Sequence, residues 1–328
     1  MKAPARMWPH VMGETEILER LEARLGALHA RQRMRIEVDH EARVFGGGVS
    51  FFHLENWYSI HSVIRTGLKI AGLHRRAERN TLDIRIVENQ VALPGLPEAF
   101  EAFRVLHLSD LHIDMNEAIV HAIVERVREI DYDLCVLTGD YRFRTFGDAS
   151  ACLDGMRRLR ASLSGTVLAV FGNHDSVAML PELEDMGIRL LMNESAAHER
   201  NGEHLYIAGI DDAHFFGVGD VAKALAGVPE QLPAILLSHT PEVYRDAARA
   251  GARLMLCGHT HGGQLCLPGG HPLTLDARIP RRLGRGAWRH GNLQGYTSPG
   301  TGSSVVGVRL NCPPEITVHV LRRAAADQ

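Results

Sequence analysis

The sequence lacks any run of about 18 apolar residues, the length that a membrane-spanning helix requires. It also lacks the apolar stretch of about 7 to 15 residues that follows the basic N-terminal residues in a secretory signal. Its 36 Lys and Arg residues nearly balance its 39 Asp and Glu residues, so the formal net charge is only −3 and no field of one sign covers the chain. We therefore expect a cytoplasmic protein that does not bind nucleic acid.

Cysteine is also scarce, with five widely spaced residues. An odd number without regular spacing is typical of reduced, packed thiols rather than of a disulfide framework. The sequence contains no G-x-x-x-x-G-K-[ST] phosphate loop, no G-x-S-x-G nucleophile elbow and no H-E-x-x-H helix. The common motif-based routes to hydrolysis or phosphate binding are therefore excluded.

Five short segments rich in Asp, Asn and His are present, and each follows an apolar run that is typical of a β-strand. The apolar runs cover residues 104–108, 134–138, 166–171, 234–237 and 252–257. The polar segments comprise residues 109–112, 139–140, 172–175, 238–239 and 258–261. Because side chains that follow neighbouring strands emerge along one edge of a sheet, we expect these segments to lie close together.

Strand-like and helical patterns alternate after residue 100, which predicts a layered α/β domain. Helical spacing covers residues 116–130, 148–163, 176–186 and 241–250, and further strand-like runs cover residues 188–191, 205–210, 305–310 and 316–321. A turn-rich link at residues 94–97 places a boundary near residue 100. We expect an N-terminal extension, residues 1–100, and a main domain, residues 101–328. The long Gly- and Pro-rich stretch 265–302 is expected to shape the site.

The N-terminal extension is predicted to contain amphipathic helices and short strands. Residues 14–34 favour one amphipathic helix, residues 49–54 a short strand, and residues 81–93 one or two strands. Residues 57–80 combine apolar positions with several Lys and Arg residues. Such a segment either packs on the main domain with solvated basic ends, which we favour, or lies on a membrane surface. The second interpretation would make the protein peripheral at the inner face of the membrane.

The polar segments supply carboxylate, amide and imidazole groups in numbers that exceed one tetrahedral ion and suit two ions sharing a ligand. The candidate ligands are Asp110, His112, Asp140, Asn173, His239, His259 and His261. Mixed nitrogen and oxygen donors fit Mn, Fe, Zn, Co or Ni, whereas a set of oxygens alone would indicate Mg or Ca. We expect two divalent transition-metal ions as cofactors.

The ordered pattern D-x-H, G-D, G-N-H-[DE], a lone His and G-H-x-H resembles the calcineurin-like metallophosphoesterase superfamily. Residues 108–112 and 258–264 are similar to its bacterial phosphodiesterase-like branch. The resemblance implies a fold in which two packed β-sheets are flanked by helices. It also implies that Asp110, His112 and His261 hold the first ion, that Asn173, His239 and His259 hold the second, and that Asp140 bridges both.

The resemblance further implies hydrolysis of a phosphodiester or pyrophosphate bond by in-line attack of a hydroxide that bridges the two ions. His174 would contact the phosphoryl oxygen and protonate the leaving group, with Asp175 orienting or charging it; a simple helix-entry residue is the alternative for His174. The substrate would be a small molecule, nucleotide- or lipid-linked. A non-catalytic, metal-bound interaction module of the same fold is the alternative function. The oligomeric state is left open.

The sequence departs from the family after the G-D element, where G-D-x-x-D is frequent and Tyr141, Arg142, Phe143 and Arg144 follow here. Arg142 and Arg144 either clamp a second phosphate or another anionic group, or pair with Asp148 at the surface. Both possibilities stay open at this point. Asp211, Asp212 and His214, which follow another strand-like run, either form a turn, which we favour, or support the metal ligands as hydrogen-bond partners.

Overall fold

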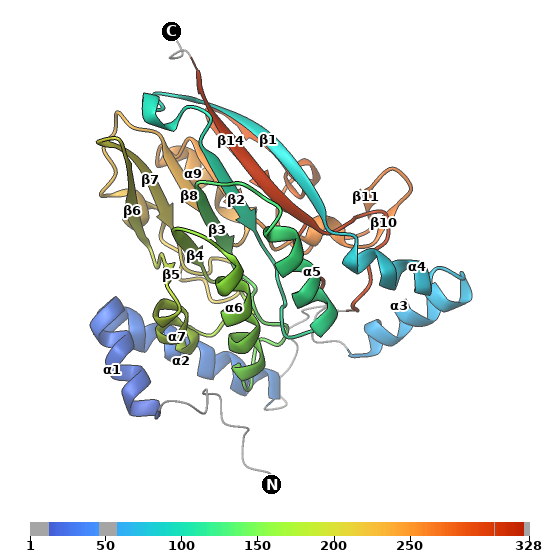
Figure 1. Cartoon of the computed structure of the whole chain (residues 1–328). Coiled ribbons are helices and arrows are strands. Elements are labelled where there is room, and N and C mark those ends of the chain that lie inside the picture. The colour runs from blue at the N-terminus through green and yellow to red at the C-terminus, as the bar shows by residue number, and fades with distance from the viewer. Residues whose placement is uncertain (1–12, 46–57, 305, 325–328) are drawn as a thin grey trace.

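The computed structural model describes residues 13–45, 58–304 and 306–324, and within them two six-stranded sheets form the centre of the molecule (Figure 1). The first sheet has the order β1 (Arg85–Pro94), β14 (Glu315–Ala324), β2 (Arg104–Leu108), β3 (Leu134–Thr138), β4 (Val167–Val170) and β5 (Ile188–Leu190). The second has the order β12 (Gly286–His290), β13 (Leu293–Thr297), β9 (Leu254–Cys257), β8 (Ala234–Leu237), β7 (Glu203–Gly209) and β6 (Glu194–Arg200). All five strands predicted to precede a polar segment are present.

The sheets pack face to face because alternate strand residues are apolar on both sides. Val105 and Leu168 of the first sheet share one buried core with Ile207 and Leu256 of the second. Helices α5 (Glu117–Val127), α6 (Ser150–Ser162) and α7 (Leu180–Asp185) contribute to the core on the outer face of the first sheet. Helices α8 (Val221–Leu225) and α9 (Tyr244–Arg249) contribute to the core on the outer face of the second. The predicted layered α/β fold is confirmed.

The N-terminal helix predicted at residues 14–34 is in fact two helices, α1 (Glu14–Leu25) and α2 (Ala27–Phe45). Gly26 separates them with a φ of 80°, a conformation that glycine adopts without the steric cost of a side chain. Ile17, Leu21 and Ala30 are buried in the core of the first sheet. The predicted strand at residues 49–54 lies outside the described residues.

Residues 58–79 form α3 (Tyr58–Ile70) and α4 (His74–Arg79), and β1 then pairs in parallel with β14. Strands on both sides of the predicted boundary near residue 100 therefore share the first sheet, and the division into two domains stays a prediction. Among the helices in the described ranges, none combines the length and apolarity needed to cross a bilayer.

One prediction for the C-terminal third is corrected. The strand expected at residues 305–310 is wrong, because residues 306–309 form no strand and Leu310 makes only an isolated bridge to Leu265. The stretch 265–302 contains β12 and β13 as well as the small hairpin β10 (Cys266–Leu267) and β11 (His271–Pro272). Since β13 pairs with β9, this stretch is part of the second sheet as well as of its loops.

Candidate metal centre

The ends of β2, β3 and β4 in the first sheet and of β8 and β9 in the second bring the five polar segments together. Two groups of buried side chains result, and within each group the ligand atoms lie within 4.8 Å of one another. The first group consists of Asp110, His112 and His261, and the second of Asp140, His239 and His259. These are six of the seven ligands that the sequence predicted.

The backbone at these strand ends is strained. Asp110, His112, Asp140, His259 and His261 have φ angles of 52°, 40°, 55°, 71° and 49°. A left-handed conformation costs a residue other than glycine on the order of 1 kcal/mol or more, and it persists where the surroundings enforce it, often at functional sites. Gly172 and Gly258 allow the close approach, because a Cβ atom at either position would overlap the carboxylate of Asp140 or Asp110.

In the first group, two imidazole rings face each other. Nε2 of His112 lies 3.2 Å from Nε2 of His261, and the latter lies 3.5 Å from Oδ1 of Asp110. Nδ1 of His112 lies 2.8 Å from the carbonyl oxygen of Arg142, which fixes its proton on Nδ1 and leaves a lone pair on Nε2. Behind His261, Nη2 of the buried Arg309 lies 3.2 Å from Nδ1.

The second group repeats this arrangement. Nε2 of His239 lies 3.2 Å from Nδ1 of His259, 3.0 Å from Oδ1 of Asn173 and 3.3 Å from Oδ2 of Asp140. Nδ1 of His239 donates to the carbonyl oxygen of Thr138 over 2.8 Å. Asn173 therefore lies beside the second group, and its role as a ligand stays a prediction.

Asp140 lies between the two groups, since its Oδ2 is also 3.8 Å from Nε2 of His112. Two imidazole nitrogens at 3.2 Å repel each other through their lone pairs unless a proton or a cation lies between them. The tautomers of His112 and His239 both direct a lone pair at such a position. Nitrogen and carboxylate donors arranged in this way fit a divalent transition metal.

Burial and neighbouring charges shift the pKa values of Asp110 and Asp140 in opposite directions. Burial, with the charge of Asp140, raises the pKa of Asp110 to about 6. Burial opposes ionisation of Asp140 too, but the imidazoles of His239 and His174 hold its pKa well below the usual value. Although burial disfavours its charged form, the carboxylate of Asp140 raises the pKa of His239 to about 10. Without a cation, Asp140 and His239 thus form an ion pair.

His174 points at this centre. Its Nδ1 donates to the carbonyl oxygen of Phe143 over 2.7 Å, and its Nε2 lies 3.9 Å from Oδ2 of Asp140. The carboxylate of Asp175 accepts backbone N–H groups of Asp140, Tyr141 and Gly172 at 2.8, 2.9 and 2.9 Å. The role predicted for Asp175, to orient His174, is therefore taken by the Phe143 carbonyl, and Asp175 orders the loop that presents Asp140.

Arg142 and Arg144, which follow the G-D element in place of the family's frequent acidic residue, differ in burial. Arg142 is only 1% exposed, and its Nη2 donates to the carbonyl oxygens of Gly147 and Asp148 at 2.8 and 3.4 Å. Both predictions for Arg142 are wrong, because its guanidinium is buried and donates to backbone carbonyl oxygens. Arg144 is exposed and stays a candidate for substrate contact.

A buried group of charged residues that links α2 to the loops beside the metal centre was not predicted from the sequence. We call this group the brace: Arg33, Glu37 and Asp211. Arg33 donates to the carbonyl oxygen of Asp175 over 3.1 Å, and Glu37 accepts from Ser176 Oγ and Val177 N at 2.7 Å each. Asp211, for which a turn was favoured over contact with the residues around the metal ligands, receives the guanidinium of Arg33 at 3.3 Å. The position of residues 211–214 could have indicated this contact, because they follow a strand at the sheet edge that carries the candidate ligands.

The chain bends at residues 213–216 around the carboxylate of Asp212, which accepts backbone N–H groups of His214, Phe215 and Phe216. His214 then lies beside the centre, with its ring centroid 4.2 Å from that of His259. His214, His259 and Asp276 form a third group of side chains that could hold an ion. Asp276 belongs to the long stretch 265–302, which is thereby placed near the metal centre.

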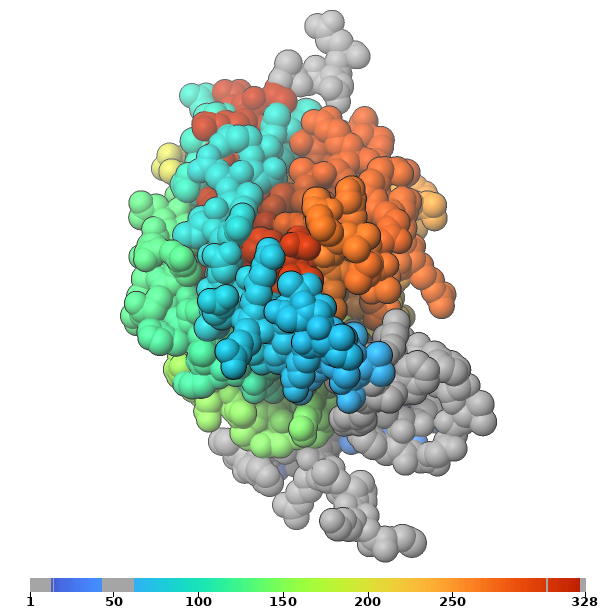
Figure 2. Space-filling model, turned by 90° about the vertical axis from the view of Figure 1, so that its right-hand side faces the viewer, coloured from blue at the N-terminus to red at the C-terminus, as the bar shows by residue number. Residues whose placement is uncertain are grey.

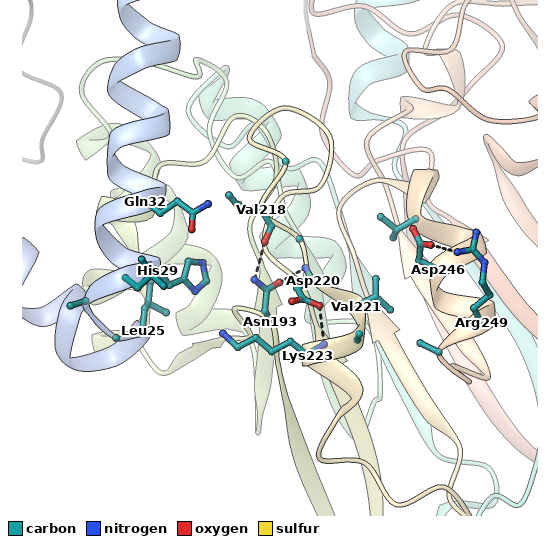
Figure 3. A pocket seen from close by; sticks show the side chains of 18 residues that line it. Leu25, His29, Gln32, Asn193, Val218, Asp220, Val221, Lys223, Asp246 and Arg249 are labelled. Carbon is teal, nitrogen blue, oxygen red and sulfur yellow. Dashed lines mark hydrogen bonds and ion pairs between the residues drawn. The ribbon is translucent and has the colours of Figure 1, made fainter.

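A hollow of about 1020 Å³ lies between the α1–α2 turn and the α8–α9 side of the second sheet (Figure 3). His29 and Gln32 face Asn193, Asp220 and Lys223 across it. None of the side chains in the metal groups lines this hollow. It is a separate feature of the surface.

Comparisons with known proteins agree with this geometry. Residues 103–263 match the family described as calcineurin-like phosphoesterase. The chain is 32% identical over 259 residues to a transmembrane protein with metallophosphoesterase domain from Danio rerio, covering 73% of this chain and 58% of that protein. It is 32% identical over 243 residues to phosphodiesterase YaeI of Escherichia coli, covering 66% and 81%. It is 28% identical over 257 residues to the uncharacterized metallophosphoesterase YkoQ of Bacillus subtilis, covering 74% and 93%.

Proposed function

The chain belongs to the calcineurin-like phosphoesterase family, and we propose that it is a metal-dependent hydrolase of a phosphodiester or pyrophosphate bond. The observation that supports this most directly is the pair of imidazole contacts at 3.2 Å, one on each side of Asp140. The phosphodiesterase relative, of which the chain covers 81%, supports the diester preference.

Two ions are proposed. Asp110, His112 and His261 would hold the first, and Asn173, His239 and His259 the second, with Asp140 between them. When bound, the two ions would activate a water molecule as the nucleophile and draw negative charge from the phosphoryl oxygens. The two carboxylates carry −2 against +4 for two divalent ions, so the loaded centre is positive and attracts an anionic phosphoester.

The chain's own residues then orient the substrate and move the proton. The Phe143 carbonyl holds the Nδ1 proton of His174, so Nε2 faces the centre. From there it would contact a phosphoryl oxygen and deliver a proton to the leaving oxygen. Arg144, exposed beside this loop, would bind a second anionic group of a nucleotide- or lipid-linked substrate.

The proposal is tested by removing and restoring metal. Purified protein is treated with a chelator and assayed on an aryl phosphodiester, an aryl phosphomonoester and a nucleoside pyrophosphate, with bound metal measured on the same samples. We expect the diester or pyrophosphate activity to disappear and to return with Mn, Fe, Zn, Co or Ni. Turnover that is unaffected by chelation would contradict the mechanism. Two bound ions without hydrolysis of any of the three substrates would favour the non-catalytic interaction module.

A further inference from the structure

Helices α3 and α4 concentrate positive charge on one surface of the molecule. Residues 58–80 contain five basic residues against one acidic residue, which gives +4 and leaves −7 for the rest of a chain whose total is −3. All five basic side chains are exposed, and we call them the basic ridge: Arg65, Lys69, Arg75, Arg76 and Arg79. The two helices extend from the side of the molecule in Figure 1 and lie on the near face in Figure 2, where they are blue. An anionic partner of this surface is therefore favoured.

Helix α3 also presents apolar side chains to solvent. Ile64 and Leu68 pack inward against a small core that includes Val308. Val63 and Ile70, seven positions apart and thus on one side of the helix, are 67% and 84% exposed. The helix therefore has one apolar face buried in the protein and exposes further apolar side chains to water.

Helix α4, which carries part of the basic ridge, is connected to the metal centre by hydrogen bonds through Arg309. The backbone N–H of Arg309 donates to the carbonyl oxygen of Ala77 in α4 over 2.8 Å, and the side chain of Asn80 donates to the carbonyl oxygen of Arg309 over 2.9 Å. The guanidinium of Arg309 reaches Nδ1 of His261. A partner bound to α3 and α4 is thus held in a defined position relative to His261.

We propose that α3 and α4 bind the surface of an anionic phospholipid bilayer, with the basic ridge on the lipid phosphates and Val63 and Ile70 in the boundary between headgroups and acyl chains. Charge attraction and apolar insertion act together in such helices. Nucleic acid would use the cations but leave Val63 and Ile70 in water. Arg65 and Lys69 also line a hollow of about 390 Å³ beside Asn116, which offers room for a headgroup.

The consequence rests on the proposed function: a lipid-linked phosphoester would be presented to the metal centre from the bilayer. The binding itself does not depend on hydrolysis. It is therefore measured separately, by flotation of the full-length protein with vesicles of phosphatidylcholine alone or with added phosphatidylglycerol.

We expect binding only to the vesicles with phosphatidylglycerol. Changing Arg65, Lys69, Arg75 and Arg76 to Ser should weaken it more than about a hundredfold, because each basic residue near an anionic surface contributes a factor of about five. Changing Val63 and Ile70 to Ser should weaken it severalfold without altering the charge. The matched controls alter the same charge or an equally exposed apolar side chain on other surfaces: Arg126, Arg128, Arg249 and Arg289 to Ser together, and Leu28 to Ser.

Absence of binding by the unchanged protein, or equal binding by the ridge variant and its control, would overturn the proposal. Binding of duplex or single-stranded DNA that depends on the ridge, with no vesicle binding, would assign the surface to nucleic acid instead. Thermal unfolding verifies that every variant is folded. The ridge variant should keep its activity on a soluble aryl diester, so loss of vesicle binding with retained hydrolysis separates this proposal from the proposed function.

Discussion

Two groups of buried charge lie side by side in this protein and differ in what balances them. Around α2, the guanidinium of Arg33 lies 2.6 Å from Glu37 and 3.3 Å from Asp211. In the metal centre, the partners of Asp140 are the imidazoles of His112, His174 and His239 and the backbone N–H of His174. The first group contains a permanent cation, whereas the second surrounds its carboxylates with imidazoles that can hold either a proton or a metal ion.

This difference in what balances the buried charge distinguishes a group that stabilises the fold from a group that can bind a metal ion. A buried carboxylate against arginine is neutralised whenever the chain is folded, so its contribution is to stability and geometry. A buried carboxylate among imidazoles is neutralised by a proton or by a metal ion, and the two compete. The brace around Arg33 holds the loops of residues 175–177 and 211, so that the second group is kept in place by the first.

The largest expected effect is that of Asp140→Asn. Hydrolysis should fall by more than about 10⁴-fold, as for a member of a catalytic unit, because the amide cannot balance two ions. At least one metal equivalent should be lost, as measured by metal analysis of the purified variant. Full metal content would contradict the bridging position.

The matched control for this change is Asp211→Asn, another buried aspartate. It removes one of two carboxylate partners from Arg33, so the free energy of unfolding should fall by about 3 kcal/mol, at the lower end for a broken buried ion pair. Metal content should stay complete. If metal is lost here while stability is unchanged, the two groups of charge are not distinct.

The next largest effect is expected for Arg33→Met. Glu37 and Asp211 would be left buried without their cation, which should cost about 3–5 kcal/mol of stability by denaturant unfolding. Arg126→Met, a change of the same chemistry at an exposed position, should cost less than about 0.5 kcal/mol. A loss below about 1 kcal/mol for Arg33→Met would show that the brace contributes little.

The clustering of the candidate ligands was predictable from sequence because each of them directly follows the strand that positions it. The strand pattern and the ligand are neighbours in the chain, so His239 and His259 could be placed at one sheet edge without knowledge of the fold. Even the pairing of the first ion's ligands, implied by resemblance to the family, agrees with the observed groups.

The brace could not be predicted in this way. Arg33 and Glu37 are four positions apart on a helix, a spacing that normally indicates a solvated surface pair. Their side chains are instead 0% and 3% exposed, and Arg33 bonds to Asp211 across 178 positions of sequence. Arg142 and Arg144 show the same limit within one loop, because the path of the backbone alone decides which of the two is buried.

A smaller effect is expected for Asp175→Asn, which lies between the two groups. The carboxylate binds N–H groups of Asp140 and Tyr141, and an amide can accept fewer of them, so about 1–3 kcal/mol of stability should be lost. Metal affinity should fall, while the pH dependence of hydrolysis by the metal-saturated variant stays that of the unchanged protein. A displaced limb of the pH profile with normal metal affinity would restore the role first predicted, that Asp175 charges His174.

The smallest expected effect is a proton released on metal binding. The raised pKa of His239, about 10 through Asp140, means that its imidazole is protonated at pH 7 when no cation is present. A metal ion at Nε2 must displace that proton. The apparent metal affinity should therefore increase about tenfold for each unit by which the pH is raised, up to this pKa. Calorimetric titration at pH 7 in buffers of different ionisation enthalpy counts the protons. In Asp140→Asn the count should fall because the imidazole loses its counter-charge, whereas Asp211→Asn should leave it unchanged. A count of zero in the unchanged protein would mean that the metal centre, like the brace, is already balanced without a proton.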